Sequence, residues 1–123
     1  MRKYIYITLS VLMLALTSCG EYQRILKSTN PDEKLDFARR AFEQKRYTQA
    51  TTVLTDIVTQ LKGTKNAEES LYLLALSYYE NKDYYNSGLY FHTYYSRYPK
   101  GKYAELARFY SGYGYYLSLI HIS

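Results

Sequence analysis

Cys19 is the residue of this chain most able to take part in covalent chemistry, because it is the only cysteine. A single thiol can form neither a disulfide within the chain nor a cysteine-based metal site. The two histidines, His92 and His121, stand far apart, and the sequence has no glycine-rich phosphate loop and no Ser-His-Asp set. We therefore expect a protein without enzymatic activity or a metal, in which Cys19 is modified.

The residues before Cys19 indicate the kind of modification. Residues 1–3 carry positive charge, and the apolar run over residues 5–16 is too short to span a bilayer as a stable helix, which is typical of a signal peptide. A leucine stands three residues before Cys19, two small residues follow it, and Gly20 comes next, as in the lipobox that lipoprotein signal peptidase cleaves. We predict that residues 1–18 are removed and that Cys19 carries an N-acyl diacylglycerol group as a membrane anchor. The alternative is an ordinary secretory signal with an incidental cysteine.

The residues after Cys19 suggest where the anchor resides. Gly20 stands where an aspartate would disfavour passage to the outer membrane, and residues 20–23 lack an acidic run of the kind that some surface-exposed lipoproteins carry. We expect a protein anchored in the outer membrane on its periplasmic face, with residues 19–29 as a tether.

A second group of residues could bind polypeptides through aromatic side chains and one guanidinium. Stacking surfaces beside a cation suit an extended peptide that has aromatic side chains and a free carboxylate. The alternative is that these side chains only pack between helices. The group consists of Arg39, Phe42, Tyr72, Leu76, Tyr79, Phe109, Tyr113 and Tyr116.

A repeat of 37 residues relates the members of this group. The segment Phe-Glu-Gln-Lys-Arg-Tyr over 42–47 returns as Tyr-Glu-Asn-Lys-Asp-Tyr over 79–84, and only Arg46 against Asp83 changes in chemical character. A constant offset over successive steps indicates a repeat array. The offset aligns Phe42 with Tyr79 and Tyr116, Arg39 with Leu76 and Tyr113, Tyr72 with Phe109, and Glu43 with Glu80, which we interpret as helix-end residues.

Each repeat unit is predicted to be an antiparallel pair of helices. Small and apolar residues recur at spacings of three and four on both sides of the short polar segments 44–46 and 81–83. This pattern resembles the tetratricopeptide repeat, whose usual length is about 34 residues. The expected fold is all-α, with helix pairs stacked as a short right-handed solenoid over residues 30–117, and the first helix of each pair lining the concave surface.

Start and stop signals set the expected helix boundaries. Asn30 can cap a helix, Pro31 suits its first position, and Glu33 completes a capping box with Asn30. Gly63 is a stop signal. We expect helices over residues 30–44, 47–62, 66–80 and 84–98, and another from about residue 102.

The segment Tyr-Gln-Arg-Ile-Leu-Lys-Ser over 22–28, followed by Asp-Glu-Lys over 32–34, resembles the start of the BamD family. These are the repeat-containing lipoproteins of the outer-membrane β-barrel assembly machinery. The resemblance covers roughly residues 19–116. Further matches are Gly63-Thr64, Ala67-Glu68, residues 71–79, Tyr90-Phe91, Tyr98-Pro99 and residues 103–105.

The resemblance implies a function in assembling outer-membrane proteins. Family members scaffold the machinery and bind unfolded barrel proteins, so the implied partners are a BamA-like barrel assembly protein and unfolded outer-membrane barrel proteins. The excess of basic over acidic residues is small, 14 against 11 once Arg2 and Lys3 leave with the signal peptide, so we expect no nucleic-acid partner.

Chains of the BamD family have about five repeats, whereas this sequence stops within its third. Residues 118–123 switch to an alternating pattern and resemble translated adapter sequence. We interpret them as an extraneous tail and expect the chain to be an N-terminal fragment. The alternative is a genuine short tail.

Two other function classes remain open. A SusD-like glycan-binding lipoprotein for nutrient uptake would use similar repeats, but sugar platforms usually rely on tryptophan, which is absent here, and such chains are much longer. A hydrolase carried on a helical scaffold would need catalytic residues that this sequence lacks.

Overall fold

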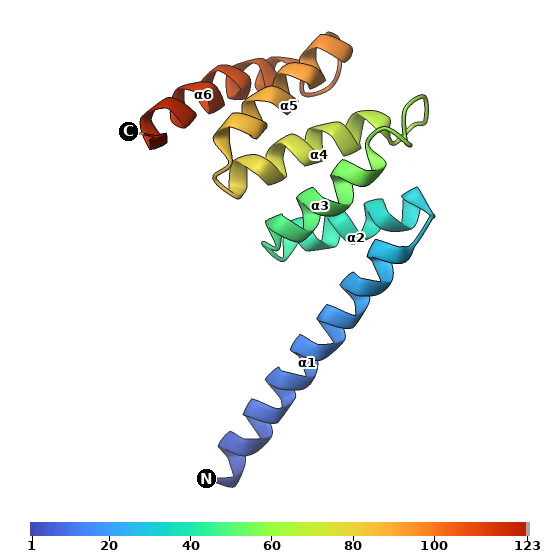
Figure 1. Cartoon of the computed structure of the whole chain (residues 1–123), viewed down its shortest axis with the longest axis vertical. Coiled ribbons are helices and arrows are strands. Elements are labelled where there is room, and N and C mark those ends of the chain that lie inside the picture. Colours follow the sequence, from blue (N-terminus) through green and yellow to red (C-terminus); the bar gives the residue numbers. More distant parts are fainter. Residues whose placement is uncertain (123) are drawn as a thin grey trace.

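The chain folds entirely into helices in the computed structural model, which describes residues 1–122, except for the side chains of residues 14–18 and 122. No strand occurs within this described part, so the prediction of an all-α fold is confirmed. The successive helices α2 to α6 pack on one another in a stack, and α1 projects away from its lower end (Figure 1). The helices are α1 (Arg2–Lys27), α2 (Pro31–Glu43), α3 (Tyr47–Ile57), α4 (Ala67–Glu80), α5 (Tyr84–Arg97) and α6 (Ala104–Ile122).

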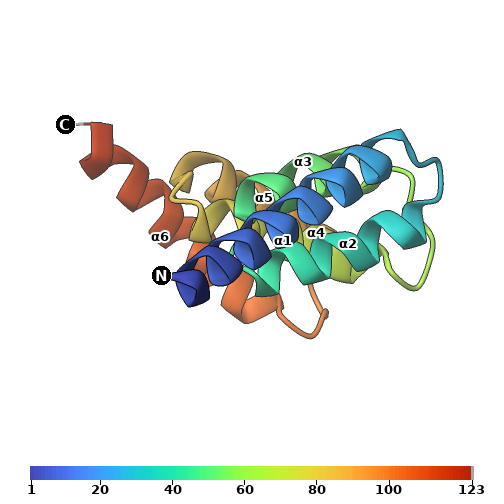
Figure 2. The same ribbon diagram turned by 90° about the horizontal axis from the view of Figure 1, so that it is seen from below.

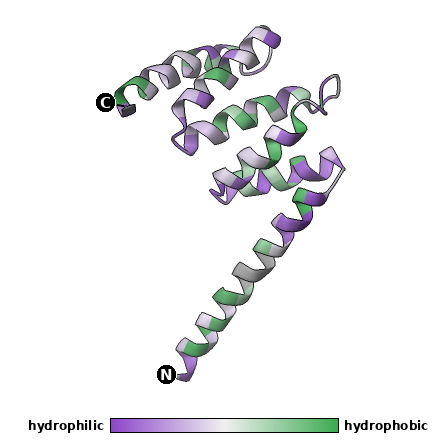
Figure 3. Cartoon of the chain, in the orientation of Figure 1, coloured by the Kyte–Doolittle hydropathy of each residue, from purple (hydrophilic) through white to green (hydrophobic). Residues whose placement is uncertain are grey.

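Two apolar clusters hold the stack together. The first joins α2 and α3 and includes Leu74 from α4, while the second joins α4, α5 and α6 around Phe91 and Tyr94. Because α4 contributes to both clusters, it is buried on two sides, and Figure 3 shows it as a largely apolar helix within the stack. The small residues Ala38 and Ala75, which stand at the repeat offset, are both fully buried. Helix pairs thus bury their apolar faces against their neighbours, as a repeat array requires.

The two turns within the pairs have the same backbone geometry. Lys45 and Lys82 adopt left-handed φ angles of 62° and 63°. In the first turn the N–H of Arg46 donates to the carbonyl of Ala41 at 2.8 Å, and the N–H of Asp83 donates to Tyr78 at 2.9 Å in the second. This is the Schellman motif, here with lysine where glycine is usual. The repeat read from sequence is therefore a repeat of backbone conformation.

The start of α2 follows the prediction only in part. The side chain of Asn30 accepts hydrogen bonds from the N–H groups of Asp32 at 3.0 Å and Glu33 at 3.4 Å, so the cap is confirmed. The capping box is wrong, because the N–H of Asn30 donates to the Ser28 hydroxyl and the Glu33 carboxylate turns toward α1. A carboxylate binds a guanidinium and a hydroxyl more strongly than one backbone N–H.

The predicted tether is helical instead. α1 continues through Lys27, and its last turns lie against the first repeat. In Figure 2, seen from below, α1 passes in front of α2 and α3, and Figure 1 shows that only its C-terminal end meets them. No helix among the described residues is both long enough and apolar enough to cross a membrane.

α5 and α6 approach each other closely at two glycines. A Cβ atom on Gly114 would lie 3.0 Å from the carbonyl oxygen of Tyr84, and Gly88 lies directly opposite. The hydroxyl of Ser111 donates to the carbonyl oxygen of Gly88 at 3.0 Å. Past this crossing α6 continues as a helix through Ile122, so the alternating pattern of residues 118–122 does not form a strand.

α3 ends earlier than predicted, at Ile57 instead of residue 62. Turns follow up to residue 66, and Gly63 lies among them with φ at +82°, a conformation that favours glycine. The chain reverses here to begin α4 at Ala67.

Candidate functional site

Cys19 lies exposed on α1, two residues before the part of the helix that contacts the repeats. The three lipobox side chains that precede it, Leu16, Thr17 and Ser18, lie outside the described side chains. An exposed thiol at this position is accessible to a modifying enzyme.

The segment that carries the family resemblance is the segment that docks α1 onto the first repeat. The ring of Tyr22 stacks on Phe37 of α2, with ring centroids 5.9 Å apart and planes 23° apart. Ile25 is fully buried in the cluster between α2 and α3. Because these residues are three apart on one helix, they share a face, and that face is the one turned to the stack.

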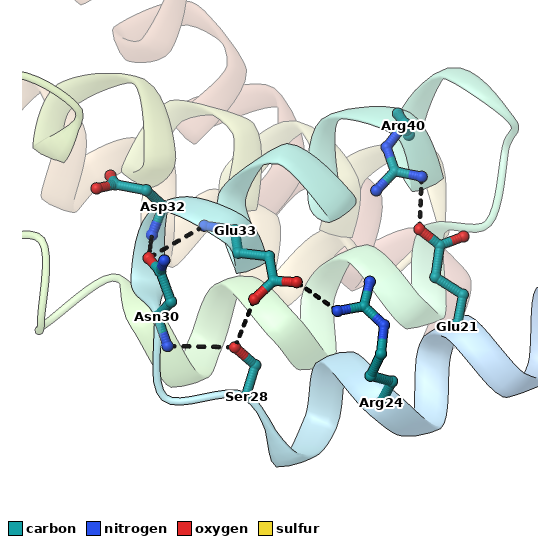
Figure 4. A network of polar contacts seen from close by, with 7 residues as sticks. All are labelled: Glu21, Arg24, Ser28, Asn30, Asp32, Glu33 and Arg40. Carbon is teal, nitrogen blue, oxygen red and sulfur yellow. Dashed lines mark hydrogen bonds and ion pairs between the residues drawn. The ribbon is translucent and has the colours of Figure 1, made fainter.

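Polar contacts flank this apolar face (Figure 4). The guanidinium of Arg40 donates to Glu21 at 2.6 Å, and it also lies over the ring of Phe37. Near the other end, Glu33 accepts hydrogen bonds from Arg24 and from the Ser28 hydroxyl. We call these residues the α1–α2 clamp: Glu21, Arg24, Ser28, Glu33 and Arg40.

The clamp changes the acidity of the Glu33 carboxyl. The hydrogen bond from Arg24, followed by that from Ser28, lowers the pKa of the Glu33 carboxyl below its ordinary value. Glu33 is therefore ionised at neutral pH and can hold both partners. The sequence shows the charges of Arg24 and Glu33, but it does not show that they pair, because they lie nine residues apart on two helices joined by a chain reversal.

Arg39, the predicted cation of the peptide groove, is already paired. Its Nε and Nη2 atoms donate to the two carboxylate oxygens of Glu69 at 2.7 and 2.6 Å, and Nη1 donates to Asp36 at 2.6 Å. The bidentate bond from Arg39 lowers the pKa of Glu69. A peptide carboxylate would have to displace Glu69 before it could bind this guanidinium.

Tyr72 does not line an open groove. It is 8% exposed, and its ring stacks on Tyr103 with centroids 4.1 Å apart and planes 8° apart. Leu76, one turn further along α4, packs against the same cluster and is half-buried. The expectation that Tyr72 belongs to an open surface is wrong, because the start of the following repeat covers its face.

Phe42 and Tyr79 make the same contact in successive repeats. Phe42 meets Tyr47 edge to face at 5.5 Å, and Tyr79 meets Tyr84 in the same way at 5.6 Å. Tyr79 has an additional edge-to-face contact with Tyr110 of α6 at 5.0 Å. Both rings therefore brace the turns, and both remain half-buried at the surface.

The remaining predicted residues form an exposed aromatic row on α6. Phe109 stacks on Tyr113 at 5.8 Å, and Tyr113 stacks on Tyr116 at 6.3 Å. Phe109 is 63% exposed and Tyr116 is 57% exposed. Leu106 and Ile120 are exposed on either side at the alternating spacing of three and four that is typical of helix–helix seams. We call this surface the α6 stripe: Leu106, Phe109, Tyr113, Tyr116 and Ile120.

The repeat shows what kind of surface the α6 stripe is. Phe109 is the equivalent of Tyr72, which is covered by Tyr103, and Tyr116 is the equivalent of Tyr79, which is contacted by α6. At Phe109 and Tyr116 the stripe thus presents to solvent positions whose equivalents on α4 are contacted by the next unit. Its geometry favours packing against another apolar segment over binding a charged group.

Within the part of the chain whose side chains are described, no group of histidine, cysteine or acidic residues could hold a metal ion. A scan against protein-family models and a search of curated proteins both returned no match to this chain.

Proposed function

We propose that this protein is a lipoprotein of the outer membrane, anchored through acylated Cys19 on the periplasmic face, that acts as a protein-binding scaffold of the β-barrel assembly machinery. The observation that carries the proposal is the docking of residues 22–28 onto the first repeat. Tyr22, Ile25 and Ser28 belong to the motif that resembles the BamD family. Tyr22 stacks on Phe37, Ile25 is buried in the cluster between α2 and α3, and the Ser28 hydroxyl donates to Glu33. These contacts support the proposal, because they give residues of the motif a role in packing α1 onto the first repeat.

The proposed partners are a BamA-like barrel assembly protein and unfolded outer-membrane barrel proteins. The surface that we propose for them is the α6 stripe together with Tyr79. Aromatic rings at the spacing of successive helical turns suit apolar and aromatic side chains of a bound polypeptide. Capture of a peptide carboxylate by Arg39 would require displacement of Glu69 and Asp36, which occupy its guanidinium.

Acylation tests the anchor. Cys19→Ala should abolish incorporation of radioactive palmitate and leave the uncleaved precursor, whereas the parent should be labelled and recovered in the outer-membrane fraction. Undiminished labelling of the Cys19→Ala variant would contradict the lipoprotein assignment.

Binding of a carboxylate-terminated aromatic peptide tests the scaffold function. Phe109→Ala should weaken it about 2- to 13-fold, since an aromatic pair contributes about 0.5–1.5 kcal/mol. Tyr85→Ala is the matched control, because Tyr85 is a similarly exposed aromatic residue on α5 outside the stripe. Equal affinities of the parent and both variants would exclude the α6 stripe as the binding surface.

A further inference from the structure

The three loops that lead into α2, α4 and α6 lie along one edge of the stack. They cover residues 28–30, 58–66 and 98–103. Figure 1 shows them on the right of the view, whereas the turns within the helix pairs lie on the left. Hydrogen bonds tie each loop to the next: the Asn66 amide donates to the Asp32 carboxylate at 3.1 Å, and the N–H of Lys102 donates to Glu68 at 3.1 Å. The three loops therefore form one surface, which we call the loop edge.

The carboxylates at the loop edge are bound by groups of the protein itself. Glu33 is held in the α1–α2 clamp. Both carboxylate oxygens of Glu69 accept from Arg39, and Glu68 accepts from the Tyr94 hydroxyl at 2.5 Å in addition to its bond across the loops. These carboxylates therefore stabilise the junctions between helices and have their hydrogen-bond donors already.

Exposed basic side chains gather on the same edge. The salt bridges among the described residues include none of them. They are Lys27, Lys62, Lys65, Arg97, Lys100 and Lys102. The opposite edge carries equal numbers of acidic and basic residues in its two turns, namely Glu43, Lys45, Arg46, Glu80, Lys82 and Asp83. The excess of positive charge on the repeats is therefore concentrated at the loop edge.

A cleft lies in the loop edge between the start of α4 and the loop before α6. Its volume is about 300 Å³, and it is lined by Lys65, Glu68, Glu69, Lys102 and Tyr103. The ammonium group of Lys102 lies over the Tyr103 ring, 5.2 Å from its centroid. Because the two glutamates already have donors, the two ammonium groups are the charges that a ligand in this cleft would meet. A side chain can enter such a cleft, whereas the flat surface of a bilayer cannot.

We propose that the loop edge binds an acidic segment of a partner protein, with one carboxylate side chain held between Lys65 and Lys102. Carboxylates complement the cations of the cleft, and the basic residues of the other loops attract further acidic residues of the same segment. This binding goes beyond the proposed function, because it needs neither acylation of Cys19 nor the α6 stripe.

The experiment measures the affinity of the full chain for a dye-labelled peptide of alternating glutamate and glycine, by fluorescence anisotropy. The same peptide with glutamine in place of glutamate controls for the dye and the backbone. One variant combines Lys65→Gln with Lys102→Gln. Its matched control combines Lys45→Gln with Lys82→Gln, which removes two exposed lysines from the opposite edge. Circular dichroism checks that both variants keep the helix content of the parent.

We expect the Lys65→Gln, Lys102→Gln variant to bind the glutamate peptide about 2- to 30-fold more weakly than the parent, which corresponds to the loss of two exposed ion pairs. The control variant should stay close to the parent. Sodium chloride at about 1 M, where the screening length is about 3 Å, should weaken binding by the parent and needs no substitution. Equal affinities of the two variants, equal binding of the two peptides, or absent or salt-insensitive binding of the glutamate peptide would each overturn the proposal.

Vesicles distinguish a protein partner from an anionic lipid surface. Both variants are sedimented with phosphatidylcholine vesicles that contain phosphatidylglycerol, and we expect them to sediment equally. A loss of sedimentation confined to the Lys65→Gln, Lys102→Gln variant would assign the loop edge to lipid and overturn the proposal. The glutamate peptide has no aromatic residue for the α6 stripe, so failure of this proposal would leave the proposed function standing.

Discussion

Replacing Gly114 with alanine would add a Cβ atom where α6 crosses α5. The atom would lie 3.0 Å from the carbonyl oxygen of Tyr84 and 3.2 Å from the Cα of Gly88. Both are backbone atoms that cannot rotate away, so the two helices would have to move apart. The hydrogen bond from Ser111 to the Gly88 carbonyl spans the same crossing and would lengthen with it.

Two effects of opposite sign decide how much Gly114→Ala changes the free energy of unfolding. Alanine is about 1 kcal/mol more favourable than glycine inside a helix. Crowding a methyl group into a packed crossing costs about 1–3 kcal/mol. Gly112→Ala isolates the first effect, because Gly112 lies in the same helix and its Cβ would meet nothing within 4 Å. We expect Gly112→Ala to stabilise the fold by about 1 kcal/mol, and Gly114→Ala to be less stable than Gly112→Ala by about 1–3 kcal/mol.

Urea unfolding followed by circular dichroism measures both variants against the parent. The comparison is informative because both substitutions change the same residue type in one helix, so changes in the unfolded chain largely cancel. Equal unfolding free energies for Gly112→Ala and Gly114→Ala would refute the close approach of α5 and α6. A lower helix content of the folded Gly114→Ala variant would instead show that the substitution destabilises the protein by disrupting α6 itself.

Two further predictions concern the turns and the clamp. Lys82 has a left-handed φ of 63°. Lys82→Gly should therefore leave the free energy of unfolding equal or higher, whereas Lys82→Val should lower it by about 1–2 kcal/mol. Urea unfolding measures both variants, and equal effects of the two substitutions would contradict the strained geometry. The folded-state pKa of Glu33 is lowered, so its contribution to stability is full above the carboxyl's unfolded pKa and is lost as pH falls through the folded value. Below about pH 4.3, the melting temperature should therefore fall less steeply with pH in Glu33→Gln than in Glu43→Gln, which changes an exposed control residue on the same helix. Identical slopes of melting temperature against pH in the two variants would refute the contribution of Glu33 to stability.

The repeat and its turns could be predicted from sequence because they depend on nearby residues. The spacing of apolar residues, the cap at Asn30 and the polar turn segments act over a few positions, and each of them was found in the structure. The nearly equal φ angles of Lys45 and Lys82 accompany similar local sequences over residues 42–47 and 79–84. An offset of 37 residues is therefore a reliable guide to the backbone.

Contacts between units could not be predicted in the same way. The spacing of Arg39 and Tyr72 places each on the first helix of a pair, but it does not say which side of that helix the next unit covers. The partner of Arg39 is Glu69, 30 residues away, and the partner of Tyr72 is Tyr103, in the segment before α6. The docking of α1 was missed for a related reason. Tyr22 and Ile25 have the spacing of a helix face, but the segment is too short for its period to stand out.

The first helices of the three units show why the exposed face of α6 is apolar. At the position where α2 has Arg39, α4 has Leu76 and α6 has Tyr113. Two turns earlier, the equivalent residues are Asp32 in α2, Glu69 in α4 and Leu106 in α6, so this position changes from acidic to aliphatic along the stack. Arg39 and Glu69 satisfy each other between the first two units, so a polar seam is stable there. A stripe that carries Leu106 and Tyr113 has no charge with which to form such a seam. A partner at this end must therefore bring apolar or aromatic side chains, and one that brings a lone carboxylate would lose its hydration without gaining an ion pair.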